Sequence, residues 1–265
     1  MIDINKAKKF YKDYISYYNP EESRIALKIA HIYRTAEEAK KIAENLELNV
    51  EDTLLAELIG LLHDIGRFEQ IKKYNTLVDS ISVNHAEYGA KVLFDDGLIR
   101  NFIEDNKYDG IIKKAILNHN KNEIDSDITD ERERLHCRII RDADKLDIYY
   151  ALLIEDIEAT YPLDRYPKEP ITDEIKYNFI KKHKINYSNI NACVDLLVGQ
   201  IAYVFDINYI YSLQKIYNEN YLEKLIKKFQ PQDEETIKEL NELKDIAEKY
   251  IQEKIKEGKI CLKNY

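Results

Sequence analysis

The sequence contains no tryptophan, only seven glycines and five prolines, and three cysteines among its 265 residues. Scarce glycine and proline disfavour an all-β architecture, which needs many tight turns. The cysteines, at positions 137, 193 and 261, lie far apart, and none forms a Cys-x-x-Cys pair. This pattern is typical of free thiols in a reducing compartment rather than of a disulfide framework.

Long apolar runs and an excess of positive charge are also missing. No stretch approaches the ~18 apolar residues that span a bilayer, and Met1–Lys6 lacks the apolar core of a secretion signal. The net charge of -9 leaves no broad cationic face for polymeric nucleic acid. We therefore expect a cytoplasmic protein with neither a membrane nor a polymeric nucleic acid as partner, although a few local cations can hold a small anion.

Helical periodicity dominates what the sequence does contain. Residues 5–18 predict a short amphipathic helix, and Asn19–Glu22 predicts an N-cap followed by proline in the first turn. The next helix carries apolar residues at spacings of three and four, and His31 lies at the edge of this stripe. Neither an internal repeat nor a low-complexity linker interrupts the chain, so we expect one all-α domain over residues 1–265.

The central stretch is Leu61–Phe68, where a strongly apolar helix ends in His63 and Asp64. Adjacent side chains inside a helix point about 100° apart, but at a helix end they can converge on one ion. Gly66 follows, where a helix end favours a residue that tolerates left-handed dihedrals. Imidazole beside carboxylate suits iron, manganese, zinc or nickel. The alternative is a core histidine next to a helix-terminal aspartate.

Three further polar residues lie on the apolar faces of predicted helices. His85 opens a helix, and Gly89, four residues later on the same face, is expected to leave room for an ion or ligand. His119 shares a face with apolar residues and should point inward, as a buried hydrogen-bonded histidine also would. Asp144 continues an apolar stripe into the interior, where an unpaired carboxylate costs several kcal/mol unless it binds a partner or a metal.

These residues together resemble the HD-domain metal-dependent phosphohydrolase superfamily over about Ser23–Leu152. The signature is a histidine, a His-Asp pair within Leu-Leu-His-Asp-Ile-Gly, and a distal aspartate within Arg-Asp-Ala-Asp-Lys-Leu-Asp. The resemblance implies an all-α helical bundle with the metal in a central cleft and a helical extension over about 153–265. It implies that the first ion is held by His31, His63, Asp64 and Asp144, and that a second, bridged by Asp64, is held by His85 and His119.

The resemblance also implies a reaction. A hydroxide bridging one or two divalent transition metal ions would attack a small phosphoester or nucleotide. Iron or manganese is expected, with zinc, nickel, cobalt and magnesium as alternatives. The chain lacks the His-Glu and Gly-Tyr-Pro motifs of cyclic-di-nucleotide phosphodiesterases and the Glu-Asp pair of alarmone hydrolases. Two other hypotheses remain: a di-iron HD-fold oxygenase, and a metal- or nucleotide-binding module without turnover.

Two cations stand next to the expected ligands. Asp64 would act in catalysis as the bridging ligand, and Arg67 and Lys145 are expected to hold substrate phosphate. An ion pair with Asp142 or Asp147 is the alternative role for Lys145. The proline-rich segment 161–170 is expected to be a lid or a connector, and the C-terminal third to cover the cleft or to form a homodimer contact.

Overall fold

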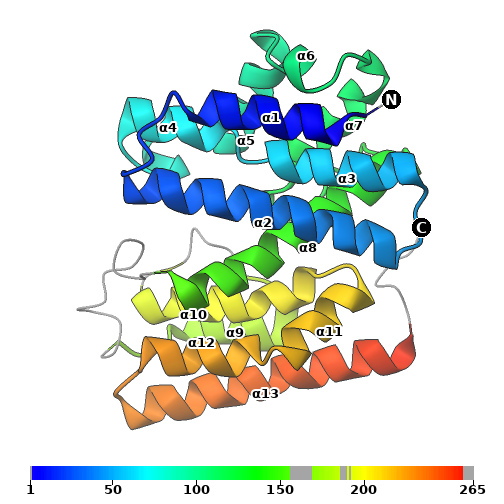
Figure 1. Ribbon diagram of the computed structural model, residues 1–265. Coiled ribbons are helices and arrows are strands. Elements are labelled where there is room, and N and C mark those ends of the chain that lie inside the picture. Colours follow the sequence, from blue (N-terminus) through cyan, green and yellow to red (C-terminus); the bar gives the residue numbers. More distant parts are fainter. Residues whose placement is uncertain (1, 156–168, 186–189, 191, 259–265) are drawn as a thin grey trace. The chain divides into compact units, whose positions relative to one another are not determined.

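The computed structural model describes residues 2–155, 169–185, 190 and 192–258. Within these ranges the regular secondary structure is helical, with no β-strand (Figure 1), and the all-α prediction is confirmed. None of the helices in this part of the chain has the length and apolar content to cross a membrane. The proline-rich segment 161–170 lies outside the described residues except for its last two positions.

The helices group into two compact units, Met1–Asp147 and Ile148–Tyr265, so the prediction of a single domain over 1–265 stays a prediction. The first unit contains α1 (Ile4–Ile15), α2 (Ser23–Asn45), α3 (Val50–Leu62), α4 (Gly66–Tyr74), η1 (Asp79–Ile81), α5 (His85–Ala90), η2 (Lys91–Asp95), α6 (Ile99–Phe102), η3 (Asn106–Tyr108), α7 (Asp109–Asn118) and most of α8 (Glu131–Ile154). The second contains the end of α8, then α9 (Asp173–Lys182), α10 (Cys193–Ile201), η7 (Ala202–Asp206), α11 (Ile210–Asn218), α12 (Tyr221–Phe229) and α13 (Glu234–Glu257).

The core of the first unit is the antiparallel pair α2 and α3 (Figure 1). Helix α3 is buried on nearly every side, as its sequence predicts, and Asn49 caps it by accepting a hydrogen bond from the Asp52 N–H. A β-carbon on Gly60 would lie 2.6 Å from the Cα of Ala36. Only glycine permits so close an approach, and it brings the faces that carry His31 and His63 together.

The start of α2 differs from the prediction. Asn19 and Pro20 lie before the helix, and Asn19 accepts a hydrogen bond from the Glu21 N–H in a local turn. Glu22 is the N-cap and accepts hydrogen bonds from Arg24 N and Arg24 Nε. Arg24 also donates to the Asn75 carbonyl at 2.7 Å. Glu22 therefore caps this helix, and Arg24 links its first turn to Asn75.

Gly66 and Gly89 have roles that differ from those expected. Gly66 is not at a left-handed helix end: it begins α4, and a β-carbon there would lie 2.3 Å from the His85 carbonyl oxygen and 2.6 Å from the Gly89 nitrogen. A β-carbon on Gly89 would lie 3.3 Å from the Gly66 nitrogen. The expectation that Gly89 leaves room for an ion is thus wrong, because the backbone of α4 fills that space. The two glycines let α4 and α5 pack backbone to backbone.

The second unit carries the longest C-terminal helix where the sequence predicts it. Helix α13 spans Glu234–Glu257, and the Asp233 side chain caps it by accepting a hydrogen bond from Thr236 N at 2.7 Å. Its apolar face is buried, as is nearly all of α10. The expected roles of this region in covering a cleft or forming a homodimer stay predictions.

Candidate metal centre

His31 lies on α2 with its ring buried and both nitrogens engaged. Nδ1 lies 2.6 Å from Asp147 Oδ2, and Nε2 faces the end of α3. From Nε2 the nearest atoms are Asp144 Oδ1 at 3.2 Å, His63 Nε2 at 3.3 Å and Asp64 Oδ2 at 3.6 Å. The carboxylate on Nδ1 fixes the ring orientation and directs the Nε2 lone pair into the cluster.

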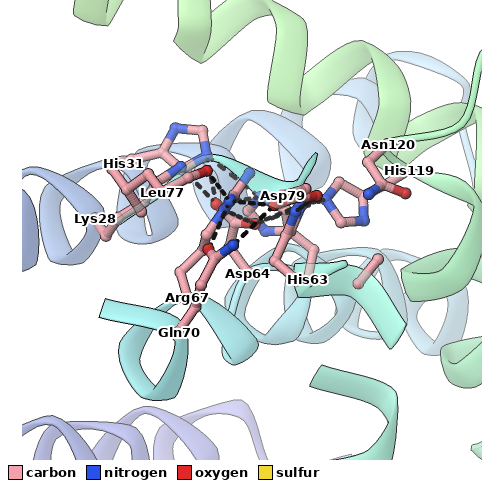
Figure 2. Close-up of polar contacts among 12 residues, drawn as sticks. Lys28, His31, His63, Asp64, Arg67, Gln70, Leu77, Asp79, His119 and Asn120 are labelled. Carbon is pink, nitrogen blue, oxygen red and sulfur yellow. Dashed lines mark hydrogen bonds and ion pairs between the residues drawn. The ribbon is translucent and has the colours of Figure 1, made fainter. Parts of the chain in front are cut away.

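His63 and Asp64 occupy the end of α3, and both are buried. His63 Nδ1 donates to the Gly60 carbonyl at 2.8 Å, so its Nε2 also faces inward. Asp64 divides its two oxygens: Oδ2 lies on the side of His31 and His63, and Oδ1 lies 3.3 Å from His85 Nε2. The sequence-based prediction that the two neighbours converge at a helix end agrees with this arrangement, and Figure 2 shows how they lie.

His85 and His119 form a second pair on the other side of Asp64. The His85 ring is held through Nδ1, 2.6 Å from Asp79 Oδ2. His119 follows α7, and its Nδ1 donates to the Ile116 carbonyl at 2.7 Å. Their Nε2 atoms lie 3.0 Å apart, and His119 Nε2 is 3.6 Å from Asp64 Oδ1. Two groups therefore emerge within the described residues, each able to hold an ion: His31, His63 and Asp64; and Asp64, His85 and His119.

Asp144 completes the first group. It lies on α8, which begins as predicted with Asp130 capping the Glu133 N–H. Asp144 Oδ1 is 3.2 Å from His31 Nε2 and 3.6 Å from His63 Nε2. Its side chain is 15% exposed, whereas the Asp64 side chain is 3% exposed. The first group thus offers two imidazoles and two carboxylates, one of which reaches toward solvent.

The geometry of these donors fits a metal ion. Two nitrogens that bind one ion at about 2.1 Å and about 90–110° apart lie roughly 3.0–3.4 Å from each other. The Nε2 pairs of His31–His63 and His85–His119 are 3.3 and 3.0 Å apart. Because each Nδ1 is held by an acceptor, facing Nε2 lone pairs repel unless a proton or a metal ion lies between them. Asp64 Oδ1 is buried and accepts no hydrogen bond from the described residues, as a ligand oxygen requires.

The electrostatics also favour a bound cation. Burial would raise the pKa of Asp64, but the Lys28 ammonium and the histidines outweigh it and hold that pKa well below its usual range. Burial lowers the pKa of His63. Burial and the Arg67 guanidinium lower the pKa of His85 to about 4. These two imidazoles are therefore neutral near pH 7 beside an ionised carboxylate, which is the state that ligates a divalent metal.

Lys28 is one of the charged residues at this centre that the sequence analysis missed. Its Nζ donates to Asp64 Oδ2 at 2.7 Å, and its side chain is 14% exposed (Figure 2). Lys28 lies three residues before His31 on α2, so the two side chains share a helix face. That spacing was the available signal, but a lysine at a helix edge is ordinarily solvated.

Arg67 and Lys145, the two cations expected to hold phosphate, have other contacts here. Arg67 Nη1 lies within 2.8 Å of Asp79 Oδ1 and also bonds to the Leu77 carbonyl, while Arg67 Nε is 3.7 Å from Asp64 Oδ1. Lys145 is buried, and its Nζ lies 3.4 Å from the Arg141 carbonyl. Their assignment as phosphate-binding residues stays a prediction.

The comparison with family models decides what this part of the chain is. The HD domain model matches residues 29–149, which include all six expected ligands. Residues 29–149 are an HD domain. The predicted resemblance to the HD domain is therefore confirmed over these residues. Neither a curated protein nor a solved structure matches the chain.

Proposed function

We propose that this chain is a metal-dependent phosphohydrolase that acts on a small phosphoester or nucleotide. The observation that carries the proposal is the convergence of four histidine Nε2 atoms on the two oxygens of Asp64 within an HD domain. When bound, a pair of divalent ions lowers the pKa of water and offsets negative charge on a phosphoryl group. Iron or manganese is the proposed metal, because mixed imidazole and carboxylate donors suit both.

The residues of the chain itself have separate tasks in this proposal. Asp64 joins the two groups because its oxygens face different histidine pairs. Asp144, the more exposed carboxylate, marks the side from which substrate arrives. Lys28 lies closer to Asp64 than Arg67 does, and its partly exposed ammonium is suited to hold a phosphoryl oxygen. No side chain needs to form a covalent intermediate.

The charge at the centre favours an anionic substrate over a neutral one. An ammonium held in a partly buried site attracts a phosphate more strongly than one in bulk water does, because the local dielectric is lower. This supports hydrolysis of phosphoesters over oxygenation of an uncharged compound by a di-iron centre. A small phosphorylated molecule, with nucleotides as the first class to test, is therefore the proposed partner.

A turnover assay tests the proposal. Protein loaded with Mn²⁺ or Fe²⁺ is assayed against nucleotides and a generic phosphodiester, with Asp64→Ala as the inactive variant. Asp52→Asn is the matched control, because Asp52 is also a buried aspartate beside a histidine, His136 at 3.1 Å, but lies outside both metal groups. We expect Asp52→Asn to retain turnover and Asp64→Ala to lose it. Consumption of dioxygen without phosphate release would favour the oxygenase, and metal binding without turnover would favour a binding module.

A further inference from the structure

The first metal group is supported by a three-residue relay. His31 Nδ1 lies 2.6 Å from Asp147 Oδ2, and Arg34 Nε donates to Asp147 Oδ1 at 2.5 Å. All three residues belong to long helices, His31 and Arg34 to α2 and Asp147 to α8. The Asp147 side chain is 2% exposed. Helical backbone and burial therefore hold this relay in place.

The second metal group repeats the same relay with different residues. His85 Nδ1 lies 2.6 Å from Asp79 Oδ2, and Arg67 Nη1 donates to Asp79 Oδ1 at 2.8 Å. The chemistry is identical: imidazole, carboxylate and guanidinium in a row. In both relays the arginine holds the carboxylate, and the carboxylate fixes which nitrogen of the ring is available to an ion.

The support beneath the second relay is different. Asp79 lies in η1, a single turn within the loop of residues 75–84 between α4 and α5, and its side chain is 31% exposed. The neighbouring Val78 and Ile81 are 51% and 74% exposed, and the partly buried Leu77 packs against the core at the start of the loop. Its position depends on polar contacts, and such segments open at lower free energy than packed helices do.

Most of those contacts come from one face of α4. Gln70 is fully buried, and its Nε2 lies within 3.0 Å of Asp79 Oδ1, Ser82 Oγ and the Val83 carbonyl. Arg67 adds the Leu77 carbonyl at 2.7 Å. Figure 2 shows Arg67, Gln70, Leu77 and Asp79 drawn together beside the metal groups. The contacts from α4 thus span the loop from Leu77 to Val83.

We propose that Asp79 is the positioning residue of the second metal group and that loop 75–84 and the ion held by His85 and His119 stabilise each other. An ion on His85 Nε2 makes the Nδ1–H a stronger donor, so it tightens the bond to Asp79 and holds the loop. By linkage, a loop held in this position favours the ion by the same factor. Arg67 acts through Asp79 as a second positioning residue. The inference rests on the proposed function only in requiring that the cluster binds ions.

The test measures Mn²⁺ binding and amide hydrogen exchange in peptides that cover residues 75–84. We expect Mn²⁺ to slow exchange of the loop in the wild-type protein. Asp79→Asn should weaken one class of Mn²⁺ site about 10–100-fold, the usual effect of losing such a partner, and should remove the slowing. Asp147→Asn is the matched control, because it alters the equivalent carboxylate of the first relay. It should weaken the other class of site and leave the Mn²⁺-dependent slowing of the loop intact.

A milder variant keeps the test valid if Asp79→Asn does not fold. Ser82→Ala removes one acceptor of Gln70 at the loop and touches neither histidine, so it should reduce together the slowing and the Mn²⁺ affinity of the class of site that Asp79→Asn weakens. If Asp79→Asn and Ser82→Ala both bind Mn²⁺ as the wild type does, with the same loop protection, the inference is overturned. If wild-type protein binds no Mn²⁺ at all, the proposed function fails instead.

Discussion

Lys28 Nζ and Asp64 Oδ2 lie 2.7 Å apart, which places an ammonium on the carboxylate shared by both metal groups. Lys28→Met keeps most of the apolar length of the side chain and removes its charge. We expect it to reduce turnover of a phosphoester about 10²-fold, the scale of one charge-stabilising donor, and to weaken inhibition by inorganic phosphate. Metal content should be retained or increased, because a cation that competes for Asp64 is gone. Loss of the metals together with activity would make Lys28 a structural residue.

The ion count provides a second prediction. Replacing His85 and His119 together by alanine should lower the Mn²⁺ stoichiometry from two to one, because both Nε2 atoms face Asp64 Oδ1. Replacing His136 by alanine is the control, since it is a buried histidine that contacts Asp52 and belongs to neither metal group. Equilibrium dialysis followed by elemental analysis measures the count. A stoichiometry of two in the double variant would leave His85 and His119 as core residues.

A third prediction concerns the close packing of α4 on α5. Gly66→Ala would place a β-carbon 2.3 Å from the His85 carbonyl oxygen, so the helices must separate. We expect a loss of about 1–3 kcal/mol or more in the free energy of unfolding. Gly110→Ala in α7 is the control: the nearest atom to its new β-carbon is Glu133 Oε1 at 3.6 Å. It should be neutral or stabilising by up to about 1 kcal/mol. Urea denaturation of both variants checks the contrast.

A feature of the fold or of the metal centre could be predicted from the sequence where residues close together in the chain determine it. It could not be predicted where the packing of distant segments determines it. The fold class follows from local signals, and the resemblance to a known family implies the six expected ligands. Apolar spacing places Asp144 on an inward face, and an abrupt helix end brings His63 and Asp64 together. The role of Gly66 does not follow from local signals. This role depends on where α5 packs, and the residues that face Gly66 are about 20 positions away in the sequence.

Asp79 illustrates the same limit at the centre itself. It lies in a loop with no periodicity, among residues that resemble an ordinary connector, yet it contacts Arg67 and His85. Arg67 is expected to hold substrate because it follows the His-Asp pair, and the sequence gives no sign that its guanidinium also contacts the Leu77 carbonyl and Asp79 in this loop. Local patterns locate a charged side chain along the chain but do not determine which partner it reaches.

Arg141 gives a fourth prediction. Its buried guanidinium donates to the carbonyls of Asn118 at 2.8 Å and Lys121 at 2.5 Å, on either side of His119. Arg141→Met should cost about 1–3 kcal/mol for each carbonyl left unpaired and should weaken the ion held by His119. Arg134→Met is the control on the same helix, because Arg134 is half-buried and donates to the Ile128 carbonyl, outside both metal groups. Equal effects of the two variants on Mn²⁺ binding would contradict the prediction.

A fifth prediction concerns acid stability away from the metal groups. Burial lowers the pKa of His136, whose Nε2 lies 3.1 Å from Asp52 Oδ1. The unfolded chain therefore takes up a proton below about pH 6.5 while the folded chain does not, so stability falls as the pH drops through that range. His136→Gln removes this titration and keeps a donor for Asp52. The free energy of unfolding of His136→Gln, measured with chelator, should fall less between pH 7.5 and pH 5 than that of the wild type. If the free energies of the two proteins fall in parallel over this range, the prediction is contradicted.

Each of the four histidines at the centre has its Nδ1 atom already held by an oxygen of the folded chain. Small zinc domains fold only when their metal arrives, because nothing else orients their ligands. In this protein the helices, with the carbonyl and carboxylate oxygens that hold Nδ1, orient the ligands. The ligands are consequently oriented before an ion binds. A chelator should therefore remove the ions without unfolding the helical bundle. One preparation of the protein can then be refilled with different metals in turn and compared directly.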